Sequence, residues 1–213
     1  MSLPPLKFML DSQLARSEED FKVALGFTSK KDKALRRHHL EGALSDAWQA
    51  YCSFVRYVLI RSATGTVASS GAMLGPSVIP PTWERVSYIG GRAANGNNVQ
   101  PGLTNNILRK EPTWGDSSKI VDIVNALAPA NGITLKANFA GGLTGPKHCQ
   151  IVRNACAHKN TQTSGEVRAI ASQYLVSAFK EPIDAMLWKV PPTNEYAFLS
   201  WIDDMKAIAA GVV

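Results

Sequence analysis

The stretch LEGALSDAWQAYCSFVRYVL, Leu40–Leu59, decides the fold expected for this chain. Its apolar residues recur with the i, i+3, i+4, i+7 spacing of one face of an α-helix. The pattern predicts a helix over about Lys31–Arg61 that forms a wall of the core. Because the aromatic residues lie on the periodic face, we assign them to packing rather than to base stacking. The positions of this stripe are Leu40, Ala43, Leu44, Ala47, Trp48, Tyr51, Phe54, Val55, Val58 and Leu59.

Shorter helical signals lie on both sides of this stretch. Ser17–Leu25 has an N-cap residue, an acidic first turn and Gly26 as a stop. Four further helices are expected to begin at Ser117 or Ser118, at Pro146, at Ser164, and at Thr193 or Asn194 after the Pro191-Pro192 turn. The fold class is therefore all-α, an up-and-down helical bundle, and 213 residues suit a single domain, 1–213.

Residues 62–116 differ in composition from the rest of the chain. They hold half of the glycines, several prolines, and runs of Ser and Asn. We expect a long irregular insertion between helices, with room for a short hairpin and with a strand at Trp83–Ile89. GGRAANGNN, Gly90–Asn98, is rich in residues that cradle phosphates, but it lacks the Lys-Ser/Thr ending of a P-loop, which argues against a nucleotide site.

The chemistry-bearing residues cluster in QIVRNACAHKN, Gln150–Asn160. Arg153 supplies a permanent cation, Asn154 an amide, and His158 a group of the type that exchanges protons near neutral pH. On a helix Asn154 and His158 lie one turn apart, roughly 40° around the axis, whereas Arg153 lies about 140° from His158. Arg153 therefore reaches the imidazole only through its long side chain or across a subunit boundary.

The pattern RNACAH, Arg153–His158, preceded far upstream by a long helix that carries Trp48, resembles the HEPN superfamily (higher eukaryote and prokaryote nucleotide-binding domains). In particular it resembles the bacterial branch whose motif reads R-N-x-x-A-H, with Ala157 at the small position. That branch often has Gly after the His, where this chain has Lys159. The resemblance covers the long helix and the segment from Ser117 to the end.

The resemblance implies a metal-independent endoribonuclease of the kind found among bacterial toxins and anti-phage effectors. In such enzymes the 2′-hydroxyl of the RNA attacks the adjacent phosphate, leaving a 2′,3′-cyclic phosphate and a 5′-hydroxyl. By this resemblance His158 moves a proton, Arg153 binds the phosphate oxygens, and Asn154 orients the His or the scissile group. Two motifs commonly meet at a two-fold interface, which implies a homodimer with a composite site, and an antitoxin or regulatory partner.

Two other interpretations stay open. The same residues suit an amphipathic helix end, where the dipole favours cations such as His158 and Lys159. A non-catalytic module of the same ancestry, holding a nucleotide, an antitoxin or an effector subunit, is the alternative function.

The net charge of +6 favours an anionic partner such as RNA. The basic start of the long helix, with Arg36 and Arg37, and Lys159 after the motif are the candidate RNA-binding residues, with a solvated basic face as the alternative. Asp46 borders the apolar stripe and is a candidate for support of the active site, or else a surface carboxylate.

The three cysteines, an odd number inside apparent helices, fit a reducing compartment. His148, Cys149, Cys156 and His158 lack the spacing of a zinc site, so we expect no metal, and we expect no cofactor either. The first residues are too short an apolar run for a signal peptide, and Arg56 interrupts the best apolar stretch. We therefore expect no membrane association and a cytoplasmic location.

Overall fold

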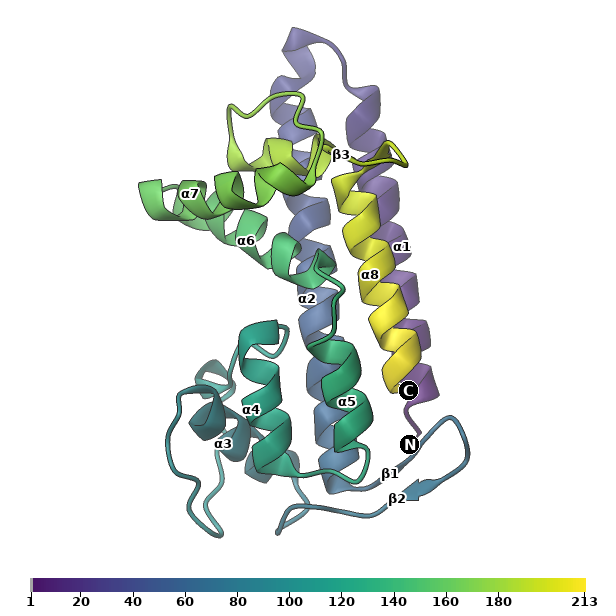
Figure 1. Cartoon of the computed structure of the whole chain (residues 1–213), viewed down its shortest axis with the longest axis vertical. Coiled ribbons are helices and arrows are strands. Elements are labelled where there is room, and N and C mark those ends of the chain that lie inside the picture. Colours follow the sequence, from purple (N-terminus) through teal and green to yellow (C-terminus); the bar gives the residue numbers. More distant parts are fainter. Residues whose placement is uncertain (1) are drawn as a thin grey trace. The chain divides into compact units, whose positions relative to one another are not determined.

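The computed structural model describes residues 2–213 and is predominantly helical, as the sequence predicts (Figure 1). Two antiparallel hairpins, each of two-residue strands, are the sheets formed by the described residues. The α-helices are α1 (Pro4–Gly26), α2 (Lys33–Thr64), α3 (Trp83–Ala94), α4 (Ser117–Leu127), α5 (Gly132–Phe139), α6 (Gly145–His158), α7 (Thr161–Ile170) and α8 (Ala197–Val212). The 3-10 helices are η1 (Lys30–Asp32), η2 (Leu108–Lys110), η3 (Ala171–Gln173) and η4 (Pro182–Leu187), and the strands are β1 (Thr66–Val67), β2 (Met73–Leu74), β3 (Lys189–Val190) and β4 (Glu195–Tyr196).

The chain divides into two compact units. The first unit comprises the residues up to Leu10, Tyr51–Leu143 and Ala207–Val213, and the second comprises Asp11–Ala50 and Thr144–Lys206. Helices α1, α2 and α8 therefore each contribute residues to both units. The segment expected as an insertion, 62–116, lies entirely within the first unit.

Helix α2 confirms the prediction made from its apolar stripe. It begins at Lys33 rather than Lys31 and ends at Thr64 rather than Arg61, and every predicted apolar position is buried. The residues before it form η1, in which the Ser29 hydroxyl accepts a hydrogen bond from the backbone N–H of Lys31 at 3.2 Å. Lys30 and Lys31 therefore lie in η1 rather than in the α-helix.

Helix α1 is much longer than predicted, because Ser17 is not its N-cap. Ser17 is buried in the middle of the helix, and its hydroxyl donates to the carbonyl of Gln13 at 3.4 Å. Buried Leu10, Leu14 and Phe21 continue one helical stripe on both sides of it. Gly26 is the last helical residue, so the predicted stop is confirmed.

The predicted strand at Trp83–Ile89 is wrong, since these residues open α3. Thr82 caps the helix, with its hydroxyl accepting from the N–H of Arg85 at 3.4 Å. Val86, Ile89 and Ala94 then lie buried on one helical face. The helix continues through Gly90, where a Cβ atom would lie 2.7 Å from the Trp114 ring. Close packing against a tryptophan distant in sequence therefore explains this glycine.

Polar anchors order the irregular part of the first unit. The Arg85 guanidinium donates to the carbonyls of Gln100 and Leu103 at 2.8 and 2.7 Å, which fixes the loop after α3. Glu111 accepts two hydrogen bonds from Arg56, at 2.6 and 2.7 Å, and a third from the Trp114 indole at 2.8 Å. The β1–β2 hairpin lies in the same segment, where a short hairpin was expected.

The remaining first-unit helices differ from the prediction mainly at their ends. Asp116, rather than Ser117 or Ser118, caps α4, because its carboxylate accepts from the N–H of Ser118 at 3.0 Å. The apolar residues of this helix, Ile120, Ile123, Val124 and Leu127, are buried, as their helical spacing predicts. Helix α5 was not predicted.

The second unit packs α6, α7, η4 and the first part of α8 with the adjoining parts of α1 and α2. Helix α6 begins at Gly145 and ends at His158, within one residue of the prediction. Helices α6 and α7 lie side by side (Figure 1). Pro191-Pro192 makes the predicted turn, but β4 occupies the residues after it, so α8 begins at Ala197 rather than at Thr193 or Asn194. Asn160 caps α7 in place of the predicted Ser164.

Candidate functional site

The start of α6 is fixed by a close approach to α8. The N–H of Gly145 donates to the Asp204 carboxylate at 2.8 Å. A Cβ atom at Gly145 would lie 2.7 Å from the Cα of Trp201 and 2.7 Å from the Cβ of Asp204. Burial raises the pKa of Asp204, while its hydrogen bonds with backbone N–H groups of Thr144 and Gly145 oppose the rise. The absence of a side chain at Gly145 therefore allows the start of α6 to approach α8 this closely.

Substitution Gly145→Ala is expected to lower the free energy of unfolding by about 1–3 kcal/mol, because backbone atoms of α8 have to move. Gly165→Ala is the matched control, because Gly165 is also helical and no other atom lies within 4 Å of the position that a Cβ atom would take there. The control is expected to be neutral or stabilising by up to about 1 kcal/mol. Urea unfolding followed by circular dichroism measures both, and equal stability of the two variants would contradict the close approach.

A buried polar chain runs behind the first turn of α6. The Trp201 indole donates to the Tyr174 hydroxyl at 2.8 Å, and that hydroxyl lies 2.6 Å from Nδ1 of His148. Since the Tyr174 oxygen already accepts a bond from Trp201, its own proton is available to an unprotonated His148 nitrogen. Burial, together with the charge of Lys147, lowers the pKa of His148 to about 4. His148 is thus a neutral core histidine, distinct from the motif.

The motif residues occupy the last turns of α6. Arg153 and Asn154 are half-buried, with the guanidinium Nη1 3.5 Å from the amide Oδ1. His158 is exposed and is the last residue of the helix. The helical geometry keeps Asn154 and His158 on one flank and holds Arg153 about 140° from His158. One copy of α6 therefore does not direct Arg153 and His158 toward the same point.

Several charged side chains lie around Cys156, on the opposite side of this helix end from His158. Burial, together with the carboxylate of Glu41, raises the pKa of the Cys156 thiol to about 12. The cations Arg37 and Lys159 act in the opposite direction, and Glu181 reinforces the rise. Cys156 is therefore not a thiolate nucleophile. The end of α6, the start of α2 and the start of η4 meet around it.

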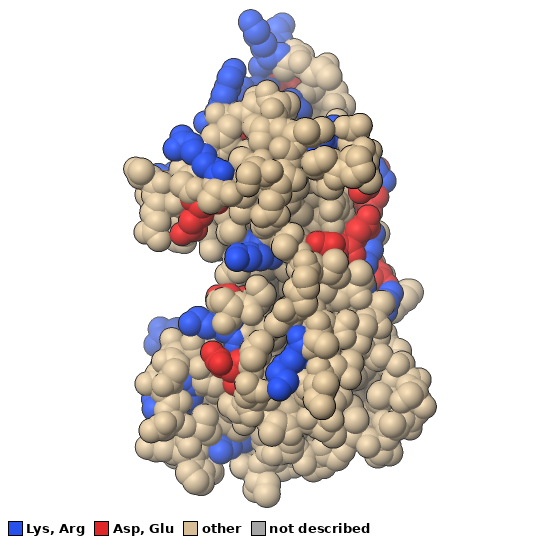
Figure 2. Space-filling model, in the orientation of Figure 1, with Lys and Arg blue, Asp and Glu red and all other residues tan. Residues whose placement is uncertain are grey.

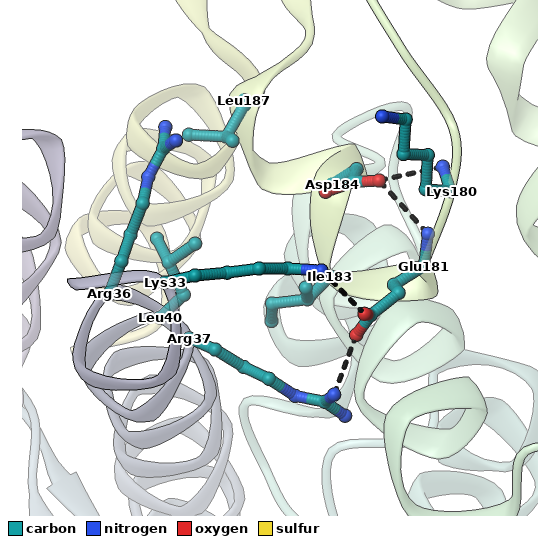
Figure 3. A pocket seen from close by; sticks show the side chains of 9 residues that line it. All are labelled: Lys33, Arg36, Arg37, Leu40, Lys180, Glu181, Ile183, Asp184 and Leu187. Carbon is teal, nitrogen blue, oxygen red and sulfur yellow. Dashed lines mark hydrogen bonds and ion pairs between the residues drawn. The ribbon is translucent and has the colours of Figure 1, made fainter. Parts of the chain in front are cut away.

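A pocket opens between the start of α2 and η4 (Figure 3). We refer to it as the α2–η4 pocket. Its cavity measures about 110 Å³. Apolar side chains form part of its lining, and charged side chains from both elements surround them. The lining residues are Lys33, Arg36, Arg37, Leu40, Lys180, Glu181, Ile183, Asp184 and Leu187.

The carboxylates of this pocket are already engaged. Glu181 pairs with Arg37 at 2.7 Å and with Lys33 at 3.8 Å. Asp184 accepts from the backbone N–H groups of Lys180 and Glu181 at 2.7 and 2.9 Å, and so caps η4. Figure 3 shows Glu181 between the two cations of α2 that it binds. Both carboxylates of the pocket therefore already have partners, Glu181 on α2 and Asp184 at the start of η4.

Arg36 differs from the other cations of the pocket. Its Nε atom is buried and has no hydrogen-bond acceptor among residues 2–213. A buried donor left without an acceptor costs about 1–3 kcal/mol. In Figure 3 the Arg36 side chain runs alongside Leu187 rather than toward Glu181 or Asp184. Cationic residues at the first turn of α2 also oppose the helix dipole, so an anion here would relieve two unfavourable effects.

The other predicted site residues lie in different places. Lys159 is exposed at the end of α6, near Cys156. Asp46 is exposed on α2, about 160° around the helix from Leu44. The carbonyl of Leu44 accepts from the Cys149 thiol of α6 at 3.9 Å, which identifies the flank of α2 that faces α6. The structure therefore does not bring Asp46 to the motif.

Sequence reasoning missed the contribution of η4. The run Glu181-Pro182-Ile183-Asp184 has the spacing of a capping box, and both of its hydrogen bonds are present. That spacing was the available signal for a helix start, although it does not indicate that α2 lies opposite. Figure 2 shows Lys and Arg side chains gathered at the end of the second unit where α1 and α2 are joined, a segment that contains Lys30, Lys31 and Lys33.

The segment Gly90–Asn98 forms no phosphate loop at a helix start. Its first residues complete α3, and Asn95 follows as the C-cap. Gly91, Arg92, Asn95 and Asn97 instead line a cavity together with Thr104, Asn105 and Lys110. Among residues 2–213, no three His, Cys, Asp or Glu side chains lie close enough together to hold a metal ion.

The fold and this arrangement define a mostly helical protein with a polar motif at one helix end and a cationic pocket nearby. Comparisons of the chain with family models, curated proteins and solved structures found no match. No helix formed by residues 2–213 combines the length and the apolar character needed to span a bilayer.

Proposed function

We propose that this chain is a metal-independent endoribonuclease that cleaves RNA by 2′-hydroxyl attack. The observation that carries the proposal is the last turns of α6, where Arg153 and Asn154 precede an exposed His158. Lys159, exposed at this helix end, adds to it, because a polyanionic substrate needs neutralising groups around the scissile phosphate.

The chemistry requires few groups, because the RNA supplies its own nucleophile. His158 takes the proton of the 2′-hydroxyl while the bond from O2′ to phosphorus forms. The bond from phosphorus to O5′ breaks, and the leaving oxygen takes a proton from water to become a 5′-hydroxyl. Arg153 binds the phosphate oxygens, whose charge grows in the transition state, and Asn154 orients the imidazole or the scissile group. The products are a 2′,3′-cyclic phosphate end and a 5′-hydroxyl end.

A homodimer with a composite site is part of the proposal. Because Arg153 and His158 diverge by about 140° around α6, Arg153 of one copy and His158 of the other would serve the same phosphate across a two-fold axis. The proposal also includes a cytoplasmic location, a role as a toxin or anti-phage effector, and restraint by an antitoxin or regulatory partner.

The test is cleavage of a mixed RNA pool in EDTA by the wild type and by His158→Ala. Wild type is expected to leave cyclic-phosphate ends, and His158→Ala is expected to leave none while keeping its thermal stability, because His158 is exposed. His38→Ala, at an exposed histidine of α2, is the matched control and is expected to retain cleavage. Equal cleavage by wild type and His158→Ala would refute the proposed role of His158.

The alternative is a non-catalytic module that holds a nucleotide, an antitoxin or an effector subunit. The half-buried contact of Arg153 with Asn154 favours it, since these side chains then act as structural groups within α6. This function predicts RNA or nucleotide binding without product ends. Expression separates the two functions: a toxic nuclease is expected to limit cell growth unless His158 is replaced, whereas a binding module is tolerated in either form.

A further inference from the structure

We propose that the α2–η4 pocket binds a phosphate group, with Arg36 as its principal ligand. The inference that this phosphate belongs to the RNA chain rests on the proposed function, whereas the pocket itself does not depend on it.

Arg36 carries an unsatisfied hydrogen-bond donor. Its Nε–H is buried without an acceptor among residues 2–213, although two carboxylates line the same pocket. Both carboxylates have other partners, Glu181 with Arg37 and Asp184 with the N–H groups at the start of η4. A guanidinium can bind two oxygens of one phosphate through its Nε–H and an Nη group, and a turn of the Arg36 side chain would present this Nε–H to a phosphate in the pocket.

Positive charge exceeds negative charge around the pocket. Four cationic side chains line the pocket, and they are opposed by its two carboxylates and by Glu41, which pairs with Arg37 at 2.8 Å from outside the lining. Glu181 neutralises one of the cations that it contacts, and Asp184 is bound by backbone rather than by a lysine or arginine side chain. Arg36 and Lys180 form no ion pair with a carboxylate of the described residues. The pocket therefore offers excess positive charge that suits a phosphate.

The cavity is partly lined by apolar side chains. Its volume of about 110 Å³ is small, below the roughly 300 Å³ at which pockets for drug-sized ligands begin. It has room for one phosphate group but not for a whole nucleotide. Leu40, Ile183 and Leu187 exclude water from one side, which strengthens the hydrogen bonds of Arg36 with an anion. The rest of a nucleotide would extend outward into solvent.

The pocket lies beside the end of α6. Arg37 and Glu181 line the pocket and also act on the Cys156 thiol, as Lys159 does. The pocket therefore lies near the end of the helix that carries His158, on the flank of Cys156 rather than on that of His158. An RNA strand that passes around the end of α6 would place a non-scissile phosphate in the pocket, with Lys159 between the two positions.

The experiment measures binding separately from cleavage. In a His158→Ala background, fluorescence anisotropy gives the affinity for a short single-stranded oligoribonucleotide, and thermal shift gives the response to inorganic phosphate and to AMP. Arg36→Ala is compared with Arg16→Ala, which removes the same charge from an exposed position of α1. Arg36→Ala is expected to weaken RNA binding about tenfold or more, to reduce the salt slope by about one phosphate contact, and to abolish the phosphate-induced shift.

Arg36→Ala removes a buried donor without an acceptor and is therefore expected to melt at or above the wild-type temperature. A loss of binding in this variant is then not caused by unfolding. Arg36→Lys is a second variant that keeps the charge but not the Nε–H, and it is expected to recover only part of the affinity. Loss of the phosphate and AMP shifts with unchanged RNA affinity would support the pocket and assign it to a free nucleotide. Equal behaviour of Arg36→Ala and Arg16→Ala with every probe would overturn it.

The outcomes also separate the pocket from the nuclease. If the wild type does not cleave RNA but binding depends on Arg36, the nuclease proposal fails and the pocket stands. If cleavage depends on His158 but no anion binding depends on Arg36, the pocket proposal fails and the nuclease stands.

Discussion

An equimolar mixture of Arg153→Ala and His158→Ala chains is expected to recover about a quarter of the wild-type cleavage rate, although neither variant cleaves RNA alone. On a composite site each active centre takes Arg153 from one copy and His158 from the other. Random association makes half of the dimers mixed, and each mixed dimer has one of its two sites intact. The quarter is therefore a consequence of the angular separation of the two side chains on α6.

Each single substitution alone is expected to have a large effect. Loss of a general acid–base group costs about 10²–10⁴-fold in rate, and loss of a group that stabilises transition-state charge costs about 10²–10³-fold. The variants are co-expressed with different affinity tags, so that mixed dimers can be isolated by two successive purifications. The rate of RNA cleavage is then measured in EDTA.

The double variant Arg153→Ala/His158→Ala is the matched control. Dimers of one wild-type chain and one double-variant chain contain no intact site, so an equal amount of double variant is expected to halve the rate of a fixed amount of wild type. Isolated mixed dimers of the two single variants that remain inactive, together with an inert double variant, would place the whole site within one chain. The nuclease would then need Arg153 to reach His158 within a single α6.

The sequence predicted helices best where packing repeats along one element. The stripe of α2 and the apolar positions of α4 lie on faces that contact the core throughout, so local spacing was sufficient. Helix α3 was missed because its residues were interpreted by local alternation. Its helical state depends on the Thr82 cap and on Trp114, which packs against Gly90 from a distant part of the sequence.

The candidate site was predictable only in part, for a similar reason. Arg153, Asn154 and His158 are neighbours on one helix, so their angular relation follows from the sequence. The α2–η4 pocket joins Arg36 to Lys180, which are far apart in the chain, and no periodicity relates them. That Arg36 lacks an acceptor is a property of the folded arrangement, since the nearby carboxylates are engaged by other groups.

His148 is expected to make the second unit sensitive to mild acid. A histidine of the unfolded chain takes up a proton as the pH falls through about 6.5, whereas burial holds the pKa of folded His148 near 4. Between these values the unfolded state binds more protons, so the free energy of unfolding falls as the pH falls and is fully restored above pH 6.5. This contribution amounts to about 2–3 kcal/mol between pH 7 and pH 4.5.

The variant His148→Gln isolates this contribution, because an amide can still bond to the Tyr174 hydroxyl but takes up no proton. Urea unfolding at pH 7 and at pH 4.5 is expected to show a drop in stability that is smaller than the wild-type drop by about 2–3 kcal/mol. His38→Gln, at an exposed position, controls for the loss of one histidine from the chain. An identical drop in wild type and His148→Gln would mean that the folded protein protonates His148 readily. The hydrogen-bonded chain from Trp201 through Tyr174 to His148 would then tolerate a charge, and the start of α6 would not depend on a neutral imidazole.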